Sequence, residues 1–125
     1  MKVGDKYNTK FLFTQEDVNK FAELTGDNNP IHLDKNYAQK SQFGCRIMHG
    51  FLSASIFSKV FGTAFPGNAI YLEQNLKFQK PMHCNREYTA QFKVLEVKNS
   101  NIIKVSTIIA IYDTKYITGT AIIKV

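Results

Sequence analysis

The fold of this 125-residue chain is decided by the stretch His49-Gly50-Phe51-Leu52-Ser53-Ala54-Ser55-Ile56-Phe57-Ser58. From residue 48 to about residue 61 the side chains are apolar or small nearly all round, and Lys59 is the only charge. A helix of this kind is buried on most of its surface. The stretch therefore predicts a central buried helix that starts at Gly50. We expect its large apolar side chains to be core, namely Phe51, Ile56, Phe57, Val60 and Phe61.

Helical patterns precede this stretch. After a short strand near Val3–Tyr7, Thr14 is a typical N-cap, and apolar residues follow at helical spacing as far as about Leu24. Gly26 then suits the end of that helix. We expect a turn over residues 27–32 and a short helix over residues 34–39.

Strand patterns follow it. Pro66-Gly67 breaks the central helix, and the remaining sequence alternates or is β-branched. We predict four antiparallel strands joined by short turns, over Ile70–Gln79, Glu87–Lys98, Ile102–Asp113 and Tyr116–Val125. Helices first and strands afterwards indicate an α+β fold, in which the sheet wraps around one long buried helix. That arrangement is the hot-dog architecture, and the length fits a single domain over residues 1–125.

The candidate chemistry lies in Gly26-Asp27-Asn28-Asn29-Pro30-Ile31-His32. A carboxylate and an imidazole stand five residues apart across a turn that contains Pro30, a geometry suited to two groups that converge on one small molecule. The start of the central helix would add free backbone N–H groups, and the N–H of Gly50 could stabilise a developing oxyanion.

Composition excludes several classes of function. The formal net charge is +6, but the lysines and arginines never form a run, so we expect no nucleic-acid binding. No uncharged run is long enough to span a membrane, and residues 1–6 lack the apolar region of a signal peptide. Cys45 and Cys84 show no metal-binding spacing with the three histidines. We therefore expect a cytoplasmic protein with reduced thiols and without a metal.

The motifs at residues 26–32, Phe43-Gly44, His49-Gly50 and Pro66-Gly67-Asn68-Ala69-Ile70-Tyr71-Leu72 together resemble the MaoC-like family of (R)-specific enoyl-CoA hydratases. The similarity extends from about Phe13 to Val97. It implies a homodimeric hydro-lyase without a cofactor, which adds water reversibly and in the syn sense to a trans-2-enoyl-CoA in fatty acid metabolism. The product would be the (3R)-3-hydroxyacyl-CoA.

The resemblance also assigns roles to residues. It places the catalytic pair on Asp27 and His32, the oxyanion donor on the backbone N–H of Gly50, and a supporting hydroxyl on Ser55. We expect Asp27 to act mainly as the base, while His32 orients the water and delivers the α-proton. Asn29 would hold the turn in shape. His49 would fix the start of the helix.

Two departures from the family pattern affect only the surroundings of this pair. Cys45-Arg46 stands where arginine-proline is usual, and His83-Cys84-Asn85-Arg86 replaces a glycine-aspartate turn. Both leave the acyl chain length and the carrier open.

Other functions fit the same residues. The carrier could be an acyl carrier protein, which would make the chain a (3R)-hydroxyacyl carrier-protein dehydratase. A hot-dog thioesterase would attack the carbonyl carbon instead, and a non-catalytic acyl-thioester binding module would keep only the fold. Taken alone, the glycine-aspartate-asparagine-proline motif is also an ordinary helix end and turn. Ser55, on a buried helix, could equally bond to a backbone carbonyl of the preceding turn.

Overall fold

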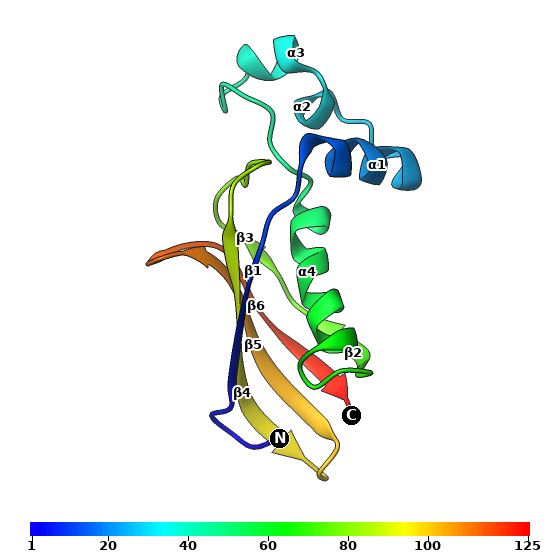
Figure 1. Cartoon of the computed structure of the whole chain (residues 1–125), viewed down its shortest axis with the longest axis vertical. Helices are drawn as coiled ribbons and strands as arrows, with labels where there is room; N and C mark the ends of the chain where they lie inside the picture. Colours follow the sequence, from blue (N-terminus) through cyan, green and yellow to red (C-terminus); the bar gives the residue numbers. More distant parts are fainter.

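The computed structural model describes all 125 residues and shows one six-stranded antiparallel sheet with a long helix on one face (Figure 1). The strands are β1 (Lys6–Phe11), β2 (Ile70–Gln74), β3 (Lys77–Phe78), β4 (Tyr88–Lys98), β5 (Ile102–Ile111) and β6 (Thr114–Lys124). The helices are α1 (Gln15–Thr25), α2 (Pro30–Leu33), α3 (Lys35–Gln39) and α4 (Gly50–Thr63). The predicted α+β class and the long central helix are confirmed.

The strands are ordered β1-β4-β5-β6-β2, with β3 also paired to β6. Only β4, β5 and β6 follow one another as a meander. The single strand predicted over residues 70–79 is two short strands, and neither forms a hairpin with β4. Residues 79–87 instead carry the chain across the sheet. The first strand also starts later than predicted, at Lys6.

Asn75 explains the break between β2 and β3. Its side chain takes the place of a regular ladder, since Nδ2 donates to Thr120 Oγ1 at 2.6 Å and Oδ1 accepts from the Thr120 N–H at 3.2 Å. Such side-chain bonding competes with strand pairing. The alternating pattern of residues 70–79 predicts one continuous strand. It does not indicate that the Asn75 side chain would replace hydrogen bonds of the ladder.

The core lies between α4 and the sheet. Phe57 and Phe61 of α4 both meet Phe92 of β4 edge to face, with ring centroids 5.7 and 5.3 Å apart. These three rings are at most 2% exposed. Phe51 is different. It was predicted to be core, but its side chain is 70% exposed, because its ring lies outside the core cluster and against the half-exposed Phe78 ring of β3.

Helices α1 to α3 lie beyond one end of the sheet, and both chain termini lie at the other end (Figure 1). Helix α1 begins at a capping box formed by Thr14 and Asp17 and ends at Gly26, which has φ +80°. Both ends agree with the sequence analysis. The predicted turn after Gly26 contains a short additional helix, α2, which Asn29 caps and in which Pro30 takes the first position.

None of the four helices combines the length and the apolar character needed to cross a bilayer.

Candidate active site

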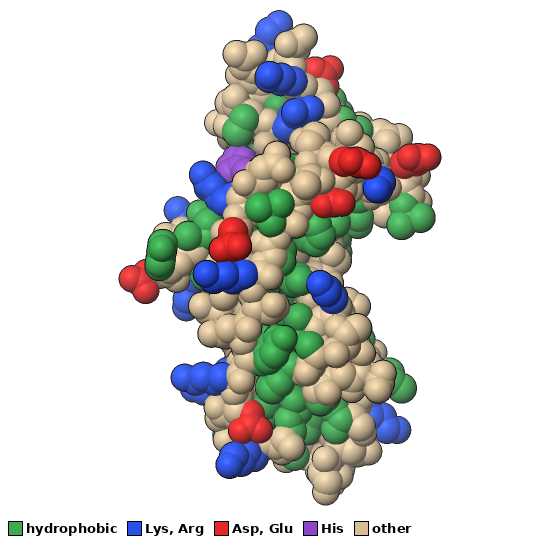
Figure 2. Space-filling model, in the orientation of Figure 1, with side chains coloured by type: hydrophobic (Ala, Val, Ile, Leu, Met, Phe, Trp, Pro, Cys, Tyr) green, Lys and Arg blue, Asp and Glu red, His purple; other side chains and the backbone are tan.

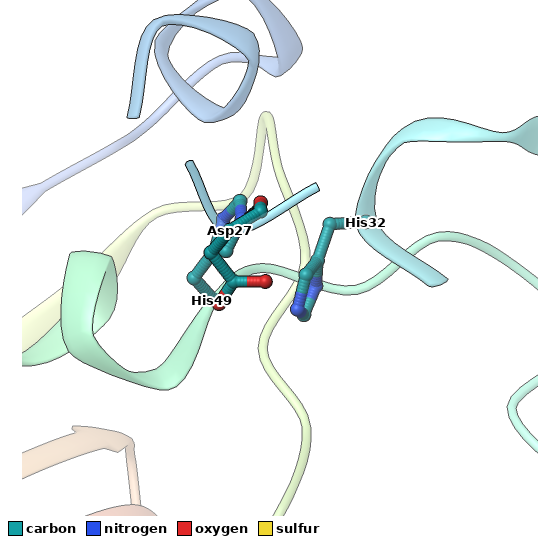
Figure 3. A group of neighbouring side chains, drawn as sticks. All are labelled: Asp27, His32 and His49. Carbon is teal, nitrogen blue, oxygen red and sulfur yellow. Dashed lines mark hydrogen bonds between the residues drawn. The ribbon is translucent and has the colours of Figure 1, made fainter. Parts of the chain in front are cut away.

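Three side chains from separate segments meet beside the start of α4 (Figure 3). Asp27 belongs to the loop after α1, His32 to α2, and His49 directly precedes α4. One potential ligand atom of each residue lies within 4.8 Å of those of the other two. Figure 3 shows the Asp27 carboxylate directed toward the His32 ring. The pair proposed from the sequence is therefore brought together by the fold.

Asn29 holds the loop that carries Asp27. Its backbone N–H donates to Asp27 Oδ1 at 3.3 Å, and its own side-chain oxygen accepts from the Ile31 N–H at 3.1 Å. The second bond caps α2, the helix on which His32 lies. Asn29 thus links the position of the carboxylate to the position of the imidazole.

His32 is held in one tautomer. Its Nδ1 lies 2.8 Å from the carbonyl oxygen of Ile47, which can only accept, so Nδ1 carries the hydrogen and Nε2 carries a lone pair. The residue is 9% exposed. Burial lowers the pKa of His32, and this effect exceeds the opposing effect of the bond to Ile47; nearby His49 lowers the pKa further, and Asp27 raises it. A neutral imidazole with a free Nε2 follows.

His49 contacts both Asp27 and His32. Its ring is 2% exposed, and Nε2–H donates to the backbone oxygen of Asp27 at 3.0 Å. The ring also lies against His32, with centroids 3.9 Å apart, and against Phe21 at 4.7 Å. Its Nδ1 is buried and has no hydrogen-bond partner. The His49 side chain makes no cap bond to α4, so its hydrogen bond holds the loop that carries Asp27 rather than the start of the helix.

Helix α4 presents unpaired donors next to this group. The N–H groups of Gly50, Phe51 and Leu52 begin the helix, and the first amide with a backbone acceptor is that of Ser53, which donates to the His49 carbonyl. Gly50 also lines a cavity of about 490 Å³ together with His32. The cavity wall is mainly apolar, and it includes Phe43, Met48, Phe78, Met82 and Ile117. An apolar cavity with a few polar groups at one end is typical of a small-molecule site.

Asp27, His32 and His49 are also the residues that could hold a metal ion. The two imidazole rings lie against each other, tilted by 32°. Each ring already uses one nitrogen on a backbone carbonyl. The arrangement fits a pair that acts on water better than a tetrahedral zinc site.

The structure separates Ser55 from this group. Its hydroxyl donates to the Leu52 carbonyl at 2.6 Å, the local bond that a serine on a helix often makes, and it lines a different cavity. Ser53 lines the cavity of His32 instead. Ser53 was not predicted from the sequence, although its spacing of three residues from Gly50 places both on one face of the helix. Lys80, on the same cavity wall, had no signal in the sequence.

The family model described as "MaoC like domain" matches residues 2–114. The chain belongs to the MaoC-like family. Its hot-dog fold is shared with the solved (R)-hydratase from A. caviae, which superposes with a TM-score of 0.94 at 35% identity and covers 100% of this chain and 97% of that one.

Two curated relatives of this MaoC-like chain differ in the carrier that their names contain. The (R)-specific enoyl-CoA hydratase of Aeromonas caviae is 35% identical over 127 residues, spanning 99% of this chain and 95% of its own length. The mitochondrial 3-hydroxyacyl-[acyl-carrier-protein] dehydratase of Arabidopsis thaliana is 36% identical over 110 residues, which are 86% of this chain and 66% of the relative. Both names describe hydro-lyases, the enzyme class expected from the sequence.

Proposed function

We propose that this MaoC-like chain is an (R)-specific enoyl-CoA hydratase, which converts trans-2-enoyl-CoA reversibly into (3R)-3-hydroxyacyl-CoA in fatty acid metabolism. The observation that carries the proposal is that His32 and Gly50 line one cavity while the Asp27 carboxylate lies next to His32. This brings a carboxylate, the free Nε2 of His32 and the unpaired N–H groups at the start of α4 close together. Neither a cofactor nor a metal is needed for this reaction.

The start of α4 would polarise the thioester. As water adds to the β-carbon, negative charge moves onto the carbonyl oxygen, and the Gly50 N–H together with the helix dipole stabilises it. One donor of this kind is worth about 3 kcal/mol of transition-state stabilisation. Because Gly50 has no side chain, the substrate carbonyl can approach its N–H closely.

Asp27 and His32 would hold one water between them. In the resting state His32 Nε2 has no proton to give, so the proton that reaches the α-carbon must come from that water. Asp27 accepts a proton from the water, and the proton then moves to His32 Nε2. His32 delivers it to the α-carbon, on the face of the double bond to which the hydroxide adds. Hydroxide and proton are thus added syn, with no net change in the protonation of the enzyme.

The test is incubation of the protein with crotonyl-CoA while the enoyl-thioester absorbance is followed and the chirality of the product is determined. We expect the absorbance to fall without release of free thiol and the product to be the (3R) alcohol. Asp27→Asn and His32→Ala should each lower the rate by about a hundred- to ten-thousand-fold while the circular dichroism spectrum is kept. Asp113→Asn, in the turn between β5 and β6, is the matched control and should leave the rate unchanged.

Three other outcomes would replace this proposal. Faster turnover of crotonyl-acyl carrier protein than of crotonyl-CoA would favour the carrier-protein dehydratase suggested by the Arabidopsis relative. Release of free thiol would indicate a thioesterase. Tight acyl-CoA binding without turnover would indicate a non-catalytic module.

We also propose that residues 1–125 act as one domain in a cytoplasmic homodimer. Strand β2 lies at an edge of the sheet, and its Ile70 and Leu72 side chains are 61% and 53% exposed. An exposed apolar edge strand is a surface for pairing with a second copy. Figure 2 shows hydrophobic side chains at the surface between the sheet and α4, whereas charged side chains of both signs are dispersed over the molecule. Light scattering that gave the mass of a monomer would contradict the dimer.

A further inference from the structure

A polar pocket of about 430 Å³ contains both cysteines of the chain. None of its residues belongs to α4 or to β2, so it lies apart from the surface on which the subunit contact is proposed. We refer to it as the thiol pocket. Among the residues that line it are Gln15, Lys35, Cys45, Arg46, His83 and Cys84.

Within the thiol pocket, Cys45 lies against His83. Cys45 Sγ is 3.7 Å from His83 Nδ1, and the same Nδ1 is 3.4 Å from the Arg46 carbonyl oxygen. Because a carbonyl oxygen only accepts, Nδ1 carries a hydrogen, and this N–H lies within hydrogen-bond distance of the sulfur. The Cys45 thiol donates to the Phe43 carbonyl at 3.7 Å, whereas a thiolate at the same place would accept from His83. The nucleophilic form of Cys45 therefore has a donor ready beside it.

The position of His83 is fixed by the core. Its backbone N–H donates to the Tyr88 hydroxyl at 2.8 Å, and Tyr88 is 1% exposed. Cys45-Arg46 and His83-Cys84-Asn85-Arg86 are also the two segments in which the sequence departs from the family pattern. Because the fold brings these two segments into contact, the Cys45–His83 pair is a feature of this chain rather than of the family.

Cys84 differs from Cys45 although both line the thiol pocket. Cys45 is exposed, whereas Cys84 is half-buried, and Cys84 Sγ donates to Gln15 Oε1 at 3.7 Å. Burial raises the pKa of the Cys84 thiol, and this effect exceeds the opposing effect of the Arg46 guanidinium. Cys84 therefore stays a protonated hydrogen-bond donor and serves as an internal control for the reactivity of Cys45.

The charges around the thiol pocket are positive. Lys35 and Arg46 line it, and no aspartate or glutamate does. The three ion pairs of the structure include neither of these two cations. A pocket with cations of this kind attracts anionic molecules and raises their concentration next to the sulfur.

We propose that the thiol pocket is a modification site, at which Cys45 forms a mixed disulfide with an anionic low-molecular-weight thiol that arrives as its own disulfide. The Cys45 thiolate attacks one sulfur of the incoming disulfide. A new S–S bond forms as the old one breaks, and the second half leaves as a thiolate, which takes a proton from water. Cys45 is oxidised as the incoming disulfide is reduced, so no further oxidant is needed. The carboxylates of a glutathione half, or the phosphates of a coenzyme A half, would lie beside Lys35 and Arg46.

The experiment incubates the full chain near neutral pH with glutathione disulfide, coenzyme A disulfide or the neutral hydroxyethyl disulfide. Mass spectrometry of the intact protein and of its peptides follows the adduct. We expect one adduct, on Cys45. Cys45→Ser should abolish it, and the matched variant Cys84→Ser should keep it. The faster of the two anionic disulfides identifies the source of the bound thiol.

Two further substitutions test how the pocket acts. His83→Phe should slow the reaction by about tenfold with all three disulfides, because the thiolate loses its hydrogen-bond donor. His83→Asn, which can place Nδ2 near the position of Nδ1, should recover part of the rate. The double variant Lys35→Gln/Arg46→Gln should slow the two anionic disulfides by about tenfold and leave the neutral one unchanged.

The outcomes test this inference independently of the proposed hydratase, since none of them depends on turnover of crotonyl-CoA. No adduct on the folded wild-type protein, or an adduct on Cys84 alone, would overturn the site. Equal rates for the wild type and His83→Phe would overturn the role of the Cys45–His83 pair. If the double variant reacted with the anionic disulfides as fast as the wild type, the anionic ligand would be overturned.

Discussion

The rings of His32 and His49 lie against each other, with centroids 3.9 Å apart and planes 32° from parallel. Each ring donates one N–H to a backbone carbonyl, His32 to Ile47 and His49 to Asp27. The His32 imidazole is thus held by the segment before α4, and the backbone of Asp27 is held by the residue that precedes the helix. The start of α4, the His32 ring and the backbone of Asp27 are therefore parts of one hydrogen-bonded unit.

His49→Phe should lower kcat for crotonyl-CoA by about ten- to a hundred-fold and change KM little. Phenylalanine keeps an aromatic ring against His32, but it cannot donate a hydrogen bond to the Asp27 carbonyl. The loop that carries Asp27 would therefore no longer be held in position. His49→Gln, which can still donate a hydrogen bond, should keep more activity. Equal rates for the two variants would show that this bond does not position Asp27.

The buried His32 gives a second prediction, for the dependence of activity on pH. Because burial lowers its pKa below the ordinary value of about 6.5, His32 stays neutral at pH 7. We expect kcat/KM to be constant from about pH 8 down to about pH 6.5 and to fall only at lower pH, as Nε2 becomes protonated. A decline that begins clearly above pH 7 would contradict a neutral His32.

The same shift of the His32 pKa affects stability. The unfolded chain binds a proton at His32 at higher pH than the folded chain does, so the free energy of unfolding should decrease as the pH falls below about 6.5. His32→Gln should weaken this part of the pH dependence. Urea unfolding at several pH values measures both, and an unchanged slope in the variant would exclude His32 as the group responsible.

Gly50 should tolerate no side chain without a loss of activity. A Cβ at this position would lie 2.6 Å from Cε1 of Phe78, so the ring would have to move into the cavity. Since Phe78 is half-exposed, Gly50→Ala should still fold but lose about tenfold or more in kcat/KM. The double variant with Phe78→Leu should recover part of the rate; no recovery would mean that the loss arises elsewhere.

Two N-caps allow stability and activity to be separated. Thr14→Ala removes the cap of α1 and should cost about 1 kcal/mol of stability with little effect on kcat. Asn29→Ala removes the cap of α2 at a similar cost, but it should also lower kcat, because Asn29 links the Asp27 loop to His32. Chemical denaturation and crotonyl-CoA turnover of both variants provide the comparison. An equal effect on turnover would contradict the proposed role of Asn29.

Local patterns predicted the ends of α1 and the position of α4, because a cap, a glycine with positive φ and an apolar stretch act over a few residues. The tautomer of His32 could not be predicted, since its acceptor, Ile47, is 15 residues away and is selected by tertiary packing. The exposure of Phe51 and the two cavities depend on how α4 is rotated against the sheet. The apolar character of the stretch, which extends nearly all round the helix, does not define that rotation.

Helices α1 to α3 lie beyond the end of the sheet and connect to the rest of the molecule around His49 and Ile47 (Figure 1). In folding terms, this end of the molecule forms a unit that can open while the strands stay paired, because none of the strand pairings of the sheet includes residues of α1 to α3. Hydrogen exchange in α1 and α2 would then be faster than in β5. Activity would be lost at a lower denaturant concentration than the one that unfolds the sheet. Turnover would therefore report whether this helical unit is folded, not whether the whole protein is.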